Sequence, residues 1–313
     1  MNRFKRIIGL AILPSVLLVA CSQEVEEPEP NNPQLEEEVS QPSETEERLM
    51  DDFRELAKDE PAPDLLIEWI DSNIEKLSAE SADELVETLR HSLELHIPIY
   101  EEELNQSNFQ EELILIDGLS ENFGEAKVDE IENQELRKLV DYLYKNNYRL
   151  VNLEGSFYPV VDYEELKDYA SYLTDEFQEY LAIKSLESTE RSMADGALMI
   201  DFDDLAQRIL QEEAYLNIAS PNERKTDILE DYEYKVTAYL KGLPNTAIRE
   251  DSNNQIKDEV LTSYQEIASQ DYEISRDLAD YLERIEANNQ KIDDGLLTEA
   301  EDLIKDLMET FTD

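Results

Sequence analysis

Apolar residues recur every three or four positions over most of the chain, which is the spacing of residues on one face of an α-helix. In the first half these stripes are Leu66, Ile70, Ile74 and Leu77 with Trp69 beside them, then Leu85, Leu89, Leu93 and Ile97, then Leu113 and Ile116, then Leu136, Leu139, Val140, Leu143 and Leu150. A capping box from Ser81 to Glu84 is expected to open the second helix, and Pro98 is expected to stop it. Strand patterns are scarce, so the sequence predicts an all-α fold that begins with a helical bundle at residues 48–151.

The stretch from Glu154 to Tyr163 is the least helical part of this pattern, because it is apolar, aromatic and interrupted by glycine and proline. Asp162 is expected to cap the helix that follows. That helix would carry Leu166, Tyr169, Leu173, Phe177 and Leu181 on one face. It would belong to the second predicted domain, a set of antiparallel helical hairpins at residues 152–313.

The second half also contains a short repeated pattern. The segment from Tyr215 to Ser220 recurs at Tyr264 to Ser269, and each copy is followed by another amphipathic segment. Ser220 and the proline after it are expected to start one of these following helices, and Thr298 is expected to cap a last helix. Over residues 203–285 the paired helices resemble tetratricopeptide-type hairpins, although the period is longer than the ~34 residues of that family.

The first residues have the layout of a bacterial signal peptide. Arg3, Lys5 and Arg6 precede an uncharged apolar run at residues 7–20. At 1.5 Å per residue this run spans roughly 21 Å, short of the ~30 Å hydrocarbon layer, so a permanent membrane-spanning helix is not favoured. The run ends at Cys21, the only cysteine of the chain.

Leu18-Val19-Ala20-Cys21 resembles the lipobox of bacterial lipoproteins. The resemblance implies a signal peptide at residues 1–20, cleavage before Cys21, and a diacylglycerol on the Cys21 thiol that holds the protein on the extracytoplasmic face of the cell membrane. The alternatives are a secretory signal with a chance cysteine, or a short uncleaved helix. With its only thiol acylated, the mature chain would have neither a disulfide nor a catalytic thiol.

Residues 21–47 consist mainly of Glu, Pro, Asn, Gln and Ser, so they are predicted to form a disordered acidic tether. The formal net charge of the whole chain is −50. A charge of that sign repels phosphate backbones and anionic headgroups, which excludes nucleic acid as an expected partner.

Two interpretations of the acidity stay open. The acidic residues would either keep an exported domain soluble, or form a surface that binds divalent cations. The acidic runs at residues 101–103 and 201–204 lack the ligand spacing and central glycine of an EF-hand loop. No specific metal site and no cofactor are therefore predicted.

Few residues suggest catalytic chemistry. His91 and His96 stand five positions apart, on different sides of a helix, and have no third strong ligand at helical spacing. If the chain is an enzyme, the favoured acid and base are Glu154 and Asp162, which flank the one non-helical aromatic segment. In that segment Phe157, Tyr158 and Tyr163 would stack on a sugar or a peptide; alternatively, they belong to the core and Asp162 is only a helix cap.

The sequence favours a non-enzymatic, lipid-anchored binding or scaffold protein of the cell envelope. Its partner would be a protein, peptide or glycan, bound in a groove between the helical hairpins. The alternatives are a carboxylate-based cell-wall hydrolase and an acidic cation-binding surface protein. The chain also resembles uncharacterised surface lipoproteins of Gram-positive bacteria, a likeness that implies no particular activity.

Overall fold

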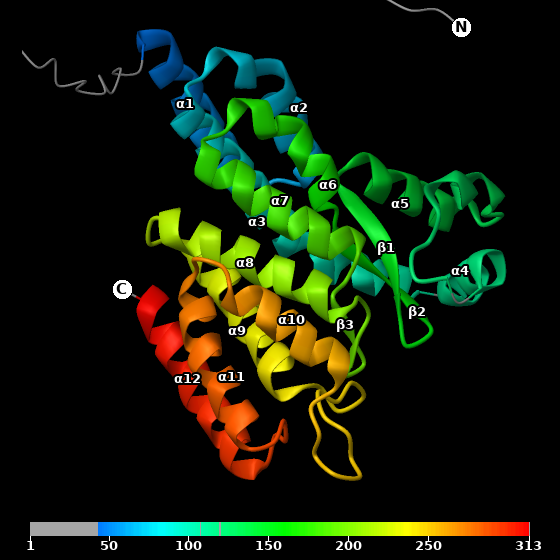
Figure 1. Cartoon of the computed structure of the whole chain (residues 1–313). Coiled ribbons are helices and arrows are strands. Elements are labelled where there is room, and N and C mark those ends of the chain that lie inside the picture. The colour runs from blue at the N-terminus through cyan, green and yellow to red at the C-terminus, as the bar shows by residue number, and fades with distance from the viewer. Residues whose placement is uncertain (1–42, 107, 119, 313) are drawn as a thin grey trace, which may run out of the picture. The chain divides into compact units, whose positions relative to one another are not determined.

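The computed structural model describes residues 43–106, 108–118 and 120–312. The predicted signal peptide, the lipidation site at Cys21 and the tether up to residue 42 lie outside these residues. Helices make up most of the described chain, which confirms the all-α prediction (Figure 1). Among the described residues, no helix has the length and apolarity needed to cross a bilayer.

The first helices are α1 (Glu44–Ala57), α2 (Pro63–Asn73), the 3-10 turn η1 (Ile74–Lys76) and α3 (Ala79–Leu104). The predicted tether was too long at its C-terminal end, because residues 44–47 belong to α1. Ser43 caps this helix by accepting a hydrogen bond from the amide of Glu46. The buried Glu46 carboxylate accepts two more from the amide and hydroxyl of Ser78, which ties α1 to the start of α3.

Helix α3 differs from its prediction at both ends. Its N-cap is Ser78, and not the predicted box at Ser81. Pro98 lies inside the helix, which continues to Leu104. A proline removes one hydrogen bond, but Tyr100 and Leu104 beyond it are buried, and their packing offsets that loss.

Helices α4 (Phe109–Asp117), η2 (Glu125–Glu130) and α5 (Gln134–Lys145) lead to strands β1 (Tyr148–Leu153) and β2 (Ser156–Val161). The strands form an antiparallel hairpin beside α4 and α5 (Figure 1). Leu150 therefore lies in β1, and not on a helix as predicted. The predicted domain boundary between residues 151 and 152 falls inside β1, and residues 42–313 form one compact unit.

The predicted helix after Asp162 is interrupted. It consists of α6 (Tyr163–Leu166), η3 (Lys167–Tyr172) and α7 (Asp175–Thr189). Asp162 caps α6 as expected. Thr174 starts α7 and is itself held by two hydrogen bonds to the Asp83 carboxylate of α3. All five residues of the predicted stripe are buried, so the stripe was right although the continuous helix was wrong.

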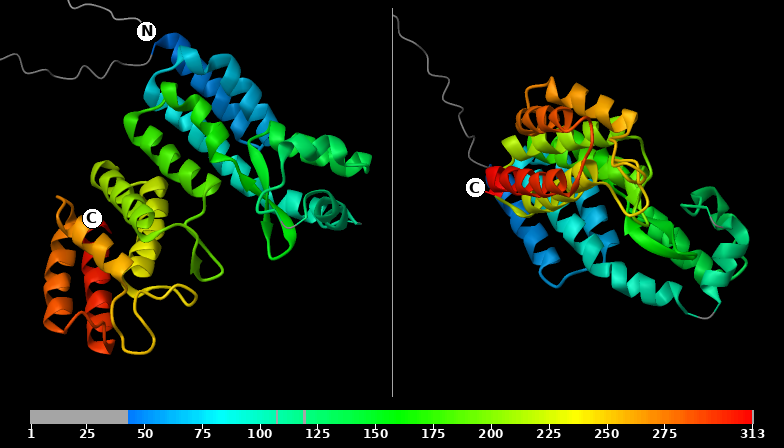
Figure 2. Two further views of the ribbon diagram at one scale, coloured as in Figure 1. Left: turned by 45° about the vertical axis from the view of Figure 1, so that its right-hand side comes forward. Right: turned by 60° about the horizontal axis from the view of Figure 1, so that its bottom comes forward.

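The short strands β3 (Met193–Ala194) and β4 (Ala197–Leu198) precede helices α8 (Phe202–Ile218), α9 (Glu223–Lys241), α10 (Asp258–Ala268), α11 (Glu273–Ala287) and α12 (Asp294–Thr312). The two predicted hairpins are α8–α9 and α10–α11, and Figure 2 shows α10 to α12 on the side of α8 and α9 away from α1. Two predicted caps were wrong, because Asn222 starts α9 and α12 begins at Asp294, before Thr298.

Candidate functional site

The β1–β2 hairpin is built from local signals. Glu154 and Gly155 both have positive φ, 53° and 89°, as a two-residue type I′ turn requires. The Asn152 side chain accepts a hydrogen bond from the Gly155 amide at 2.9 Å and holds the turn. The inner face of the hairpin is buried, with Tyr148 donating its hydroxyl hydrogen to the Leu93 carbonyl of α3.

Both edges of the hairpin are closed. Along β1, the amide of Phe123 donates to Leu150 and the amide of Asn152 donates to Glu121. Along β2, the Gln110 side chain binds both the amide and the carbonyl of Phe157, at 2.8 Å each. Pro159, two residues further, has no amide hydrogen to offer. An extended peptide therefore cannot form a complete strand ladder along this edge of β2.

The outer face of the hairpin forms one wall of a hollow of about 390 Å³. Helices α3, α6 and α7 and the segment after α7 form the rest. We call this hollow the hairpin groove. It is lined by Glu94, Ile97, Arg149, Val151, Leu153, Val160, Val161, Tyr163, Lys184, Glu187, Ser188 and Arg191. Its volume lies within the range of ligand pockets, about 300–1,000 Å³.

Four of the five charged residues of the groove have partners of opposite charge. Glu94 binds Arg90 at 2.7 Å, and Arg191 binds Glu121 at 3.1 Å. Lys184 lies 3.1 Å from both Asp227 and Asp231.

Glu187, the fourth, binds Arg208 at 3.0 Å and accepts hydrogen bonds from the amide and hydroxyl of Ser192. The charges of Glu94, Arg191, Lys184 and Glu187 are therefore balanced by other side chains of the protein, and a ligand is not required to balance them.

Arg149 is the fifth charged residue, and it differs from the others. It is half-buried on the outer face of β1, yet it forms no salt bridge or hydrogen bond with any residue that the structure describes, and its Nε atom is buried without a partner. Burial, and to a smaller degree the charge of Arg191, lowers the pKa of Arg149, and the charges of Asp162 and Glu121 oppose this shift only in part. In a chain with a net charge of −50, a half-buried arginine without a salt bridge to any described residue is unexpected.

Tyr163 and Lys184 are fixed in their protonated forms. Burial, together with Glu94, raises the pKa of Tyr163 to about 12, so its hydroxyl stays a donor to Glu94 at 3.1 Å. Burial alone would lower the pKa of Lys184, but Asp231 and Asp227 raise it above its usual value. Lys184 is therefore an ammonium ion at neutral pH and not an amine nucleophile.

The structure places the three predicted binding aromatics differently. Phe157 is buried edge-on against Phe123 and belongs to the core. Tyr163 lines the hairpin groove. Tyr158 lines an adjoining hollow of about 580 Å³, which shares Leu153 and Arg191 with the groove. Two of the three aromatics therefore border the same depression.

The predicted carboxylate pair is not brought together. Glu154 lies in the hairpin turn and Asp162 follows the far end of β2. At ~3.3 Å per residue, eight residues of extended chain separate them by roughly 26 Å. The carboxylates of a glycosidase stand about 5–9.5 Å apart, so this pair lacks the required geometry.

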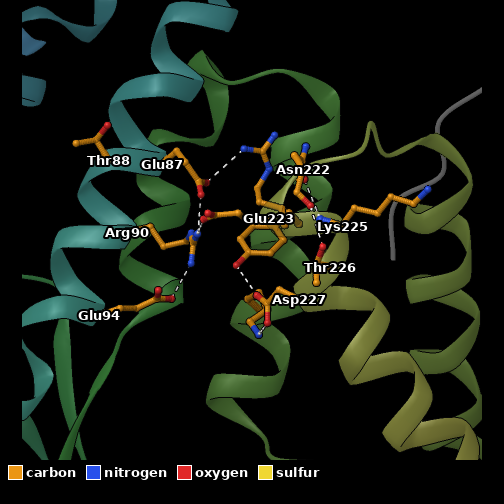
Figure 3. A network of polar contacts seen from close by, with 12 residues as sticks. Glu87, Thr88, Arg90, Glu94, Asn222, Glu223, Lys225, Thr226 and Asp227 are labelled. Carbon is orange, nitrogen blue, oxygen red and sulfur yellow. Dashed lines mark hydrogen bonds and ion pairs between the residues drawn. The ribbon is translucent and has the colours of Figure 1, made fainter. Parts of the chain in front are cut away.

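A polar network lies next to the groove and shares Glu94 with it (Figure 3). Arg90 of α3 lies between Glu87 and Glu94, and Tyr180 of α7 donates to Asp227 of α9 at 2.7 Å.

Arg224 of α9 connects three helices in this network. It reaches Glu87 of α3 at 3.3 Å and Glu176 of α7 at 3.1 Å, over the ring of Phe177. These contacts fix the distances between the helices that form the groove wall.

The remaining candidates do not form sites. His91 is exposed, whereas His96 is half-buried with its Nδ1 2.8 Å from the Ser92 carbonyl, so the two histidines do not converge. Within the described residues, no group of three potential metal ligands lies close enough to hold an ion. In the C-terminal hairpins, Tyr215, Tyr232 and Tyr264 are buried in the core.

The hollow between α11 and α12 is mainly acidic, and its one aromatic is the buried Tyr281.

Comparisons with protein-family models, with curated proteins and with solved structures found no match to this chain. The likeness to tetratricopeptide-type hairpins therefore stays a prediction from the sequence pattern.

Sequence reasoning missed Arg149, Lys184 and Arg191. For Arg149 a signal existed, because it alternates with the apolar residues Tyr148 and Leu150, as an outward residue of a half-buried strand does. Lys184 and Arg191 gave no such signal, since nothing in their neighbourhood along the chain distinguishes them from surface cations.

Proposed function

We propose that this chain is a non-enzymatic binding protein of the bacterial cell envelope, held on the outer face of the membrane by lipid on Cys21, with the hairpin groove as its ligand site. The observation that carries the proposal is Arg149, a half-buried arginine without a partner among the described residues, in a groove with apolar walls. Leaving such a cation unpaired costs stability, which is the expected property of a group kept for a ligand.

The groove also combines apolar walls with a single available charge among the described residues, as ligand-binding sites commonly do. Val151, Leu153 and Val160 provide apolar contact, and one charged group provides orientation. The other charged residues are held by protein partners, so they shape the site and do not compete for the ligand. No nucleophile with an adjacent base is needed for this role.

The anchor is tested by cell fractionation. The natural chain should be found with the membrane, and the variant Cys21→Ser should leave that fraction. Mass spectrometry should find a lipid-modified cysteine at the start of the mature natural chain. A Cys21→Ser variant that stays with the membrane as the natural chain does would contradict the anchor.

The groove is tested by photocrosslinking on intact cells. A photoreactive amino acid is placed at Tyr158, which lines the hollow that adjoins the groove, and in a control at Leu115, which is 85% exposed and lines neither hollow. We expect a reproducible adduct from position 158 that is absent from position 115. The same adducts from both positions, or none from 158, would overturn the proposed site.

A further inference from the structure

We propose that the hairpin groove binds a long-chain fatty acid, with the carboxylate on Arg149 and the acyl chain along Val151, Leu153 and Val160. This inference rests on the proposed function and names its ligand class. It follows from the walls, the volume and the single unpaired charge of the groove.

The walls favour an acyl chain over a peptide. A bound peptide needs partners for its amides and carbonyls, because unpaired polar groups are costly to bury. Here most main-chain groups of β1, β2, α3 and α7 are paired inside those elements, and the Gln110 side chain occupies the amide and carbonyl of Phe157 at the edge of β2. A hydrocarbon chain needs no hydrogen bonds, so this surface suits it.

The volume favours one chain. A hollow of 390 Å³ holds roughly 13 groups of the size of a water molecule, each about 30 Å³. A single acyl chain of about 12 carbons fits this space. A diacyl phospholipid would need about twice as much. The adjoining hollow of about 580 Å³ is lined in part by Glu121, Glu154 and Asp195, so it does not suit a second acyl chain.

The charge of the head group follows from Arg149. Its planar guanidinium forms paired hydrogen bonds with a carboxylate, and it is the one groove cation without a partner among the described residues. One unpaired positive charge matches one negative charge. Because the whole chain is strongly acidic, short anions are repelled, and only an acid with a long apolar chain gains enough from burial to bind.

The experiment is a calorimetric titration of residues 42–313, a compact unit with its own core, with dodecanoate below its micelle concentration. We expect saturable binding that strengthens roughly tenfold for each pair of methylenes from octanoate to dodecanoate. Dodecyltrimethylammonium, with the same chain and the opposite charge, should bind at least tenfold more weakly.

Two matched pairs of variants locate the site. Arg149→Gln should weaken dodecanoate binding by roughly tenfold to a hundredfold, and Arg137→Gln, an arginine outside the groove, should leave it unchanged. Leu153→Gln should also weaken binding, whereas Leu115→Gln should not. Leu153 is 39% exposed, so its variant keeps the test valid if the arginine variant fails to fold, as judged by circular dichroism.

Equal binding by the natural chain and by both groove variants, or tighter binding of the ammonium compound, would overturn the inference. A protein or glycan crosslinked from position 158, in a chain that does not bind dodecanoate, would overturn the fatty acid and leave the proposed function standing. Failure of both experiments would overturn both.

Discussion

The Gln110 side chain of α4 binds both main-chain polar groups of Phe157: its Nε2 donates to the carbonyl and its Oε1 accepts from the amide, at 2.8 Å each. This contact replaces the strand that would otherwise pair with β2. We predict that Gln110→Ala lowers the free energy of unfolding by about 2 kcal/mol, since it leaves two main-chain groups without their partners.

Urea unfolding measures this change, and hydrogen exchange of the Phe157 amide should become faster. Gln134→Ala is the control, because the Gln134 side chain makes one exposed hydrogen bond of 3.4 Å. Equal effects of the two substitutions would show that the contact to Phe157 has no special role.

The lack of a salt bridge between Arg149 and any described residue predicts that replacement of this arginine stabilises the fold while it weakens ligand binding. Replacing it with Met removes a half-buried charge without a partner among the described residues, so we expect the free energy of unfolding to rise by about 1 kcal/mol. Arg208→Met is the contrasting variant, because Arg208 is buried and binds Glu187 and Glu190. It should lose about 3–5 kcal/mol. Thermal and urea unfolding of both variants decide whether the two arginines differ in this way.

Glu187 predicts a dependence of stability on pH. Burial raises its pKa, but Lys235, the hydrogen bonds from Ser192 and the charge of Arg208 together lower it below the ordinary 4.5. A pKa that is lower in the folded state gives stability that is present above the unfolded value and is lost as pH falls through the folded value. The contribution of Glu187 should therefore be complete at pH 7 and disappear as the pH falls below about 4.5.

Glu187→Gln should cost about 2 kcal/mol at pH 7 and progressively less as the pH falls below 4.5. The measurement is urea unfolding of both proteins over this pH range. Glu309→Gln serves as the control, since its side chain is 68% exposed and its pair with Lys305 is expected to contribute little. A constant difference between Glu187→Gln and the natural chain at all pH values would contradict the assignment.

The position of Arg224 between α3 and α7 predicts that this one side chain contributes strongly to the stability of the helices that form the groove wall. Arg224→Ala removes the partner of Glu87 and Glu176 and the contact over the Phe177 ring, so we expect a loss of about 3 kcal/mol. Arg224→Lys should recover only part of it, because a lysine ammonium lacks the planar fork that reaches both carboxylates. Arg276→Ala is the control, because the Arg276 side chain is 65% exposed, and it should change stability by less than about 0.5 kcal/mol.

The single tryptophan reports whether the two predicted domains unfold together. Trp69 lies in α2, in the first half, whereas far-ultraviolet circular dichroism reports the helices of both halves. Because residues 42–313 form one compact unit, we expect the two signals to give the same urea midpoint. Separate midpoints would instead support independent domains at residues 48–151 and 152–313.

Much of the fold followed from patterns between neighbours along the chain. The stripes led by Leu66, Leu85 and Leu136 lie on buried helix faces, and Asp162 caps a helix as predicted. The hairpin of α8 and α9 was also predicted from its local repeat. The predicted lipidation at Cys21 depends on the sequence alone and stays a prediction.

The tertiary structure decided what depends on residues far apart in the sequence. Helix α3 passes through Pro98 because distant residues pack on its last turns. The β1–β2 hairpin has a local turn signal, but its place in the fold is set by packing against α3, α4 and α5. Likewise, Glu121 forms a salt bridge with Arg191, whereas no described carboxylate lies within salt-bridge distance of Arg149. Periodicity records the environment of a residue averaged over one helix or strand, but whether a charge has a partner depends on how separate elements pack, and that information is not local.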